Sequence, residues 1–125
     1  MRLLSVQDVL SIHQTVIHAH ELQGQAPDKS LDAVVERVLN RVRYGQISDV
    51  FELAASYAAF IAVAHAFNDA NKRTAFATMD TILALNGLLL NYGNPPQAGD
   101  MIIKVVLGEI DEHDLAAWLR EKSSL

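Results

Sequence analysis

The sequence predicts an all-α fold, a compact single-domain bundle of about six helices. Apolar residues recur three and four positions apart through most of the chain, and no segment alternates with period two for long enough to form a strand. Ser, Asp and Gly stand at the ends of these periodic stretches, as is typical of helix caps. We expect the 125 residues to form one domain over residues 1–125, with a core large enough to fold alone.

The first two helices are predicted from capping residues that precede apolar stripes. Ser5 and Asp8 have the spacing of a capping box, which starts a helix that fades at His20. The expected apolar stripe of this helix consists of Leu10, Ile12, Val16 and Ile17. A loop that contains glycine and proline follows, and Ser30 caps a second helix over residues 31–43.

The two middle helices are predicted to pack together at the centre of the bundle. Asp49, or the serine before it, caps the third helix. Residues 53–64 of that helix are apolar on nearly every side, which favours a buried position, and their many alanines let neighbours approach closely. A fourth helix is expected to begin near Ala70 or Asn71 and to end at Gly87.

The C-terminal third is predicted to contain a turn and two further helices. Residues 93–96 combine glycine, asparagine and two prolines, which is typical of a turn. A fifth helix is expected over residues 101–107, with a stop at Gly108. Asp111 and Asp114 then open the last helix of the bundle.

Composition excludes several classes of function. The chain has no cysteine, which rules out disulfides, thiolate metal sites and cysteine nucleophiles. No apolar run approaches the roughly 20 residues needed to cross a bilayer, and the start of the chain lacks a secretory signal. The net charge of -5 and the pI near 5.4 disfavour direct binding of nucleic acid by bulk charge. We therefore expect a cytoplasmic protein that contacts neither membrane nor nucleic acid.

A short polar segment, residues 65–74, lies between the two apolar middle helices. Burying polar groups is costly unless they are paired or used, so this segment requires an explanation. It coincides with the expected start of the fourth helix, where unpaired N–H groups and a partial positive charge favour a phosphate. The segment therefore predicts an anion site at that helix terminus.

The side chains of the segment predict transfer of a phosphorus group from a nucleotide to a hydroxyl. His65 suits a general base, and Asp69 suits a magnesium ligand whose shell the nucleotide and water complete. Lys72 and Arg73 can hold phosphate oxygens, while Phe67 is expected to anchor the loop. Taken singly, His65 is more simply explained as a core histidine and Asp69 as a helix N-cap. Lys72 and Arg73 would be a solvated first turn, so only the combination of these residues indicates a catalytic site.

Residues 65–76 resemble the signature of the Fic/Doc family, His-Pro-Phe-x-Asp/Glu-Gly-Asn-Gly-Arg-x-x-Arg. The signature residues kept here are His65, Phe67, Asp69, Asn71 and Arg73. The departures are Ala66 for proline, Ala70 and Lys72 for the two glycines, and Phe76 for the final arginine. The Ala-Asn-Lys-Arg core at residues 70–73 resembles the Doc branch, the death-on-curing toxins, and we judge the likeness to extend over nearly the whole chain.

The resemblance implies a toxin of a toxin–antitoxin module, a kinase that transfers the γ-phosphate of ATP to a threonine of elongation factor Tu and so blocks translation. Its implied catalytic residues are His65 as base, Asp69 as Mg²⁺ ligand, and Lys72. Its implied phosphate-binding residues are Asn71, Lys72, Arg73 and Thr74. A lysine in place of the second signature glycine blocks close approach of the backbone to the nucleotide, which favours transfer of phosphate over transfer of AMP.

Two other functions remain open: AMP transfer to a protein hydroxyl, and a catalytically idle module that binds an antitoxin. The resemblance also implies an antitoxin whose disordered tail binds in a groove of the toxin. Some family members instead carry an inhibitory Ser/Thr-x-x-x-Glu-Gly/Asn helix. The nearest match here, Ser48 to Glu52, is followed by Leu53, so inhibition by a separate partner is expected.

Three histidines near the N-terminus invite a metal-binding interpretation. Their spacing does not place two histidines one helical turn apart, so we expect His13, His18 and His20 to be surface or partner contacts. Residues 44–47 are equally compatible with a plain loop and with an edge that aligns a target segment by backbone pairing.

Overall fold

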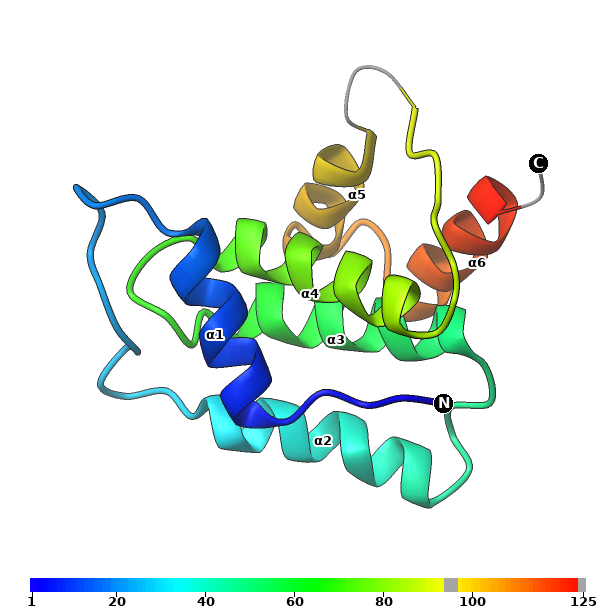
Figure 1. The fold of residues 1–125 in the computed structure, drawn as a ribbon, viewed down its shortest axis with the longest axis horizontal. Coiled ribbons are helices and arrows are strands. Elements are labelled where there is room, and N and C mark those ends of the chain that lie inside the picture. The colour runs from blue at the N-terminus through cyan, green and yellow to red at the C-terminus, as the bar shows by residue number, and fades with distance from the viewer. Residues whose placement is uncertain (94–96, 124–125) are drawn as a thin grey trace.

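Six helices make up the framework of residues 1–93 and 97–123, the part of the chain that the computed structural model describes (Figure 1). They are α1 (Val6–Val16), α2 (Leu31–Arg43), α3 (Val50–Ala64), α4 (Asn71–Leu85), α5 (Gln97–Val106) and α6 (Glu112–Ser123). No strand occurs among these residues, so the predicted all-α fold is confirmed. The turn predicted at residues 93–96 lies outside the described residues except for Gly93, whose φ is 91°.

The predicted caps of the first three helices are present. Ser5 and Asp8 form a reciprocal capping box, in which the Ser5 N–H donates to the Asp8 carboxylate at 2.8 Å and the Asp8 N–H donates to the Ser5 hydroxyl at 3.2 Å. Ser30 and Asp49 each accept the N–H three residues further on, at 3.1 Å and 2.8 Å. Asp49 is therefore the N-cap of α3, in agreement with one of the two predicted candidates.

The first helix differs from its prediction in length and in register. It ends at Val16 and not near His20, with Ile17 extended at φ -78° and ψ 142°. The Val16 carbonyl accepts a hydrogen bond from the side chain of Arg73 at 2.6 Å, so this helix end is satisfied from outside the helix. The fully buried positions of α1 are Val9 and His13, which places the core-facing stripe beside the predicted one.

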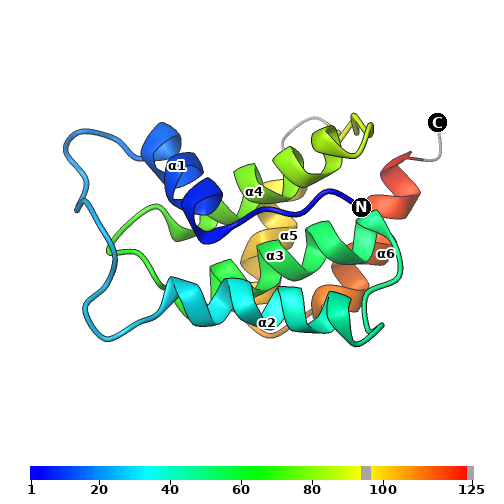
Figure 2. The same ribbon diagram turned by 60° about the horizontal axis from the view of Figure 1, so that its bottom comes forward.

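The helix α3 is the centre of the bundle, as predicted. It contacts α2, α4, α5 and α6, which surround it in Figures 1 and 2, whereas α1 packs on α4 and α2. Leu53, Tyr57 and Ile61 of α3 are completely buried, and each such side chain contributes about 1.5–3 kcal/mol of hydrophobic free energy. Ala54 and Ala58 are buried beside them and let the neighbouring helices lie close.

The connection between α3 and α4 lies at one end of this central pair, beside the end of α1 and the long connection between α1 and α2 (Figures 1 and 2). An isolated antiparallel bridge between Gln25 and Phe67 joins the two connections. This arrangement brings the polar segment of residues 65–74 together with a stretch of chain that precedes it by about 40 residues. Among the described residues, no helix has the length and apolar character needed to span a membrane.

Candidate functional site

Two residues in the left-handed region bound the loop between α3 and α4. His65, the C-cap of α3, has φ 50° and ψ 45°, and Ala70, the N-cap of α4, has φ 63° and ψ 28°. A residue with a β-carbon pays about 1–2 kcal/mol for this conformation, so surrounding contacts must hold it. The backbone therefore turns sharply at both ends of the loop, and the two predicted chemical groups His65 and Asp69 lie within one tight connection.

The side chain of Asn71 closes this loop from inside. Its Oδ1 accepts the Phe67 N–H at 3.0 Å, and its Nδ2 donates to the Phe67 carbonyl at 2.9 Å. Both functional groups of the amide are thus used by the loop backbone. The prediction that Asn71 binds nucleotide stays a prediction, and its second side-chain N–H and its backbone N–H are the donors left for such a contact.

Phe67 anchors the loop, as expected, and its partner is a histidine that the sequence analysis placed at the surface. Phe67 is buried, and its ring stacks on the ring of His13 with centroids 3.8 Å apart and planes 6° from parallel. The His13 Nε2 lies 2.9 Å from the carbonyl oxygen of Asp69, so this nitrogen carries the donated proton. The surface prediction for His13 was wrong because Val9 and His13, one turn apart, share the buried stripe; that spacing was the available signal.

The connection between α1 and α2 holds the loop from the other side. The Ala26 N–H donates to the Ala66 carbonyl at 2.8 Å, and the Asn68 N–H donates to the Gly24 carbonyl at 3.0 Å. The Asn68 side chain adds a hydrogen bond to the Gln23 carbonyl at 2.9 Å. The loop is thus fixed by backbone pairing with a segment that the local sequence pattern does not identify.

Arg73 is paired with a glutamate that the sequence analysis did not single out. Its guanidinium forms an ion pair with Glu21 and donates to the Val16 carbonyl. The other carboxylate oxygen of Glu21 accepts the His18 N–H at 2.8 Å. The hydrogen bond from Arg73 is the main cause that lowers the pKa of Glu21 from 4.5 to about 2. Arg73 has five N–H groups, so this pairing leaves donors for a phosphate.

In contrast to the guanidinium of Arg73, the ammonium group of Lys72 is unpaired among the described residues. Its side chain is exposed and has no hydrogen bond or ion pair with any described residue. The backbone N–H groups of residues 71–73 likewise have no acceptor in the described part of the chain, and the Thr74 N–H, at 2.9 Å from the Ala70 carbonyl, begins the hydrogen-bonding ladder of α4. A free ammonium beside free N–H groups at a helix N-terminus suits an anion.

The role of Thr74 in phosphate binding stays a prediction, and its hydroxyl has a partner at the N-cap of α4. Its side chain is fully buried, and its hydroxyl donates to the Ala70 carbonyl at 2.8 Å. Threonine in a helix commonly bonds the carbonyl one turn earlier, which turns the hydroxyl away from an incoming ligand. Sequence spacing places Thr74 in the first turn of α4, but it does not show that the side chain points inward.

The remaining predicted residues share one cavity of about 290 Å³. It is lined by His65, Asn68, Asp69, Ala70, Asn71, Lys72 and Arg73. The carboxylate of Asp69 is half-buried there and accepts the Ala70 N–H at 3.1 Å. No cluster of three or more metal-binding side chains exists among the described residues, so Asp69 would be a lone protein ligand. That fits Mg²⁺, which usually keeps water and takes its other ligands from phosphates.

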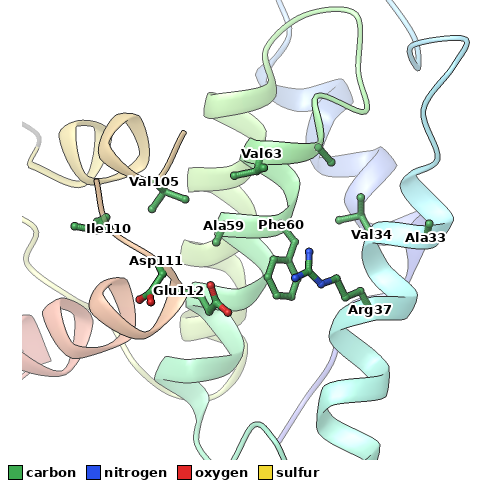
Figure 3. Close-up of a pocket in the computed structure, with 11 residues that line it drawn as sticks. Ala33, Val34, Arg37, Ala59, Phe60, Val63, Val105, Ile110, Asp111 and Glu112 are labelled. Carbon is green, nitrogen blue, oxygen red and sulfur yellow. The ribbon is translucent and has the colours of Figure 1, made fainter. Parts of the chain in front are cut away.

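A larger groove lies elsewhere and contains none of the predicted site residues. Its volume is about 460 Å³, and Figure 3 shows it between α2, α3 and the start of α6. The guanidinium of Arg37 covers the Phe60 ring there, 3.9 Å from its centroid. The groove is lined mainly by apolar side chains together with Arg37, Asp111 and Glu112, and no histidine that could act as a base is among the described residues that line it. The chemical composition of the smaller cavity, and not its size, marks the candidate active site.

Two comparisons relate this chain to known proteins. Residues 3–83 match the model of a family described as the Fic/DOC family. The chain is also 34% identical over 121 residues to a protein named "Protein kinase doc" from Escherichia phage P1. The aligned region covers 96% of this chain and 94% of that relative.

Proposed function

Because this chain belongs to the Fic/DOC family, we propose that it is a protein kinase of the Doc type. It transfers the γ-phosphate of ATP to a hydroxyl on a protein. The observation that carries this proposal is the cavity in which His65, Asp69 and Lys72 meet the free N–H groups of α4. The similarity to a relative named as a protein kinase supports it.

In the proposed reaction, His65 accepts the proton of the attacking hydroxyl. The hydroxyl oxygen forms a bond with the γ-phosphorus, the bond from that phosphorus to the bridging oxygen breaks, and ADP leaves. The backbone N–H groups of residues 71–73 and the ammonium of Lys72 stabilise the negative charge on the transferring group. Because the helix fixes its backbone N–H groups before the substrate arrives, these donors need little reorganisation during the reaction.

Asp69 is the residue that would hold Mg²⁺, in keeping with its half-buried carboxylate at the edge of the phosphate cavity. The bound cation would neutralise phosphate charge during transfer. His13 and Ala70 fix the Asp69 backbone and carboxylate through the hydrogen bonds described above. The protein itself therefore orients the carboxylate before any cation binds.

Lys72 also favours phosphate transfer over AMP transfer. Its side chain occupies the position of a signature glycine, where a bare backbone would let the nucleotide phosphates approach closely. The exposed ammonium instead offers a point charge at the mouth of the cavity. This charge suits the terminal phosphate of a nucleotide that presents its γ end to α4.

The target and the partner follow from the same family relationship. We propose that the acceptor is a threonine of elongation factor Tu, that the modification stops translation in the cytoplasm, and that the protein is the toxin of a toxin–antitoxin module. A cognate antitoxin with a disordered tail would neutralise it. The described residues contain no copy of the inhibitory Ser/Thr-x-x-x-Glu-Gly/Asn motif, which supports control by a separate chain.

The test is mass spectrometry of purified elongation factor Tu after incubation with this protein, ATP and Mg²⁺. We expect the mass of one added phosphate, located on a threonine. An added AMP would replace the kinase assignment with AMP transfer. An unmodified elongation factor would overturn the target, and an unmodified proteome would leave the idle antitoxin-binding module as the function.

His65→Asn is the matched catalytic control. Asparagine tolerates the left-handed conformation of residue 65 better than most residues, so the loop should persist while the base is lost. Phosphate transfer should fall by a factor of about 10²–10⁴. His20→Asn, which changes an exposed histidine outside the cavity, should leave the rate unchanged. A fully active His65→Asn protein would show that His65 is not the base.

A further inference from the structure

A second cavity adjoins the candidate active site along α4. It has a volume of about 270 Å³ and is lined by Lys72, Arg73, Phe76, Gly99, Ile102 and Ile103. Lys72 and Arg73 also line the phosphate cavity, so the two cavities meet at these side chains. Beyond these two cations, the second cavity offers an aromatic ring, two isoleucines and a glycine. It therefore suits an apolar, flat group attached to an anionic one.

From this shared lining we infer that the second cavity, here called the Phe76 pocket, binds the base of the nucleotide donor. The inference rests on the proposed function, which places the γ-phosphate at the N-terminus of α4. From Asn71 to Phe76 the helix rises about 7.5 Å, at about 1.5 Å per residue. The remaining phosphates and the ribose would lie along this stretch of the helix. The base then reaches the Phe76 pocket, with Lys72 and Arg73 beside the phosphate chain.

The ring of Phe76 is held in place as a stacking surface. It is half-buried and makes an edge-on contact with Tyr92, whose ring centroid lies 5.4 Å away. Tyr92 is itself fixed, because its hydroxyl donates to Asp80 at 2.8 Å and its ring stacks on Trp118. A base that stacks on a fixed ring loses less conformational freedom than one that must order its partner.

The opposite wall of the pocket leaves room for a flat ring. A β-carbon placed on Gly99 would meet no atom within 4 Å. Ile102 is buried and part of the core, whereas Ile103 is partly exposed at the rim. These walls carry no side-chain hydrogen-bonding group other than the two cations. The pocket therefore binds a base by its shape and not through hydrogen bonds to its polar edge. Adenine and guanine should consequently bind with similar affinity.

The test compares ligands that share the phosphates and differ in the base. Isothermal titration calorimetry in Mg²⁺ buffer measures the affinity for AMP-PNP, for GMP-PNP and for inorganic tripolyphosphate, which has no base. Gly99→Leu should fill the pocket without strain, since leucine is a good helix former. We expect it to weaken AMP-PNP about tenfold, as expected for loss of a stacked base, and to leave tripolyphosphate unchanged.

Three further variants of this chain are titrated with AMP-PNP and tripolyphosphate in the same way. Gly99→Ala adds a methyl group to open space and should bind AMP-PNP like the wild type. Ile103→Ala removes part of the rim and should weaken AMP-PNP about threefold while tripolyphosphate stays unchanged; it also replaces Gly99→Leu if that variant fails to fold. Lys72→Ala should weaken both ligands, because the lysine contacts phosphate and not the base.

Clear outcomes overturn the inference. An unchanged affinity of Gly99→Leu for AMP-PNP would show that the base does not bind in the Phe76 pocket. An apolar side chain of a partner protein would then be its occupant. An equal loss for tripolyphosphate, or a preference of more than tenfold between AMP-PNP and GMP-PNP, would also contradict it. A wild type that binds AMP-PNP in this manner yet phosphorylates nothing would retain the base pocket and refute the kinase. If Gly99→Leu transfers phosphate normally and binds AMP-PNP with unchanged affinity, the kinase activity stands and the base pocket is refuted.

Discussion

Single residues set the geometry of the candidate site, and two of them do so in a conformation unfavourable to their side chains. His65 and Ala70 both have positive φ, and the loop between them carries Asp69. At position 70 the resembled signature has glycine, which adopts this conformation freely. Compared with glycine, the alanine at position 70 therefore lowers the stability of the folded state, and no contact of its methyl group compensates for this. Asn71 and His13 compensate by bonding the loop backbone.

The variant Ala70→Gly should consequently be more stable than the wild type. Relief of the left-handed strain outweighs the greater freedom of glycine in the unfolded chain, so we expect the free energy of unfolding to rise by about 0.5–1 kcal/mol. Urea denaturation measures this difference. The matched control is Ala77→Gly, inside α4, which should lower the stability by about 1 kcal/mol. A loss of stability in both variants would show that Ala70 is not strained.

At the scale of elements, α1 positions the start of α4. The guanidinium of Arg73 reaches the last carbonyl of α1, and Glu21 just beyond α1 binds the same guanidinium. His13 of α1 contacts the loop before α4. The short first helix, which makes no major contact with α3, therefore has its main effect on the candidate site.

This linkage between α1 and α4 predicts a specific dependence of stability on pH. Because pairing lowers the pKa of Glu21 from 4.5 to about 2, its contribution is present above pH 4.5 and is lost as the pH falls toward 2. The wild type should therefore melt at a higher temperature than Glu21→Gln at neutral pH, and the difference should shrink between about pH 4.5 and 2. Thermal unfolding followed by circular dichroism across this range measures it.

Glu36→Gln is the control for this experiment. Glu36 lies on α2, is largely exposed, and has only a 4.0 Å ion pair with Arg43, so its removal should change little at any pH. A constant difference between wild type and Glu21→Gln from pH 6 to pH 2 would show that the carboxylate charge does not hold the two helices together.

At the scale of the whole molecule, the first residues of the chain join the two central helices. The Tyr57 hydroxyl of α3 donates to the Leu4 carbonyl at 2.7 Å and accepts the Leu4 N–H at 3.1 Å. Asn86, at the end of α4, makes the same two-way exchange with the backbone of Arg2. The N-terminal segment thus crosses the α3–α4 pair at the end opposite the candidate site.

Loss of the Tyr57 hydroxyl should destabilise the protein without affecting nucleotide binding. Tyr57→Phe leaves the Leu4 N–H and carbonyl buried without partners, and we expect a loss of about 2 kcal/mol in the free energy of unfolding by urea. Tyr44→Phe removes an exposed hydroxyl and should change stability by less than about 0.5 kcal/mol. Equal effects of the two changes would contradict this account of the N-terminal segment.

Local signals in the sequence were sufficient for the helices and for part of the site. Ser5, Ser30 and Asp49 each cap the helix that follows, because a cap involves residues only three positions apart. The pairing of Arg73 with Glu21 joins residues 52 positions apart, and no local pattern indicates it. The direction of the Thr74 hydroxyl also depends on packing, which spacing alone does not determine.

The backbone pairing between residues 24–26 and 66–68 has a consequence for how the molecule opens. The amides of Ala26 and Asn68 donate across the same short bridge. The buried apolar residues of the two connections that it joins are Phe67 and two small alanines, Ala66 and Ala70. Such a region separates by local fluctuation while the α3–α4 core stays intact. These two amide protons should then exchange with solvent at one common rate, faster than those of α3. We therefore expect the cavity for phosphate to be the first part of the protein to be lost on warming, in molecules that are otherwise folded.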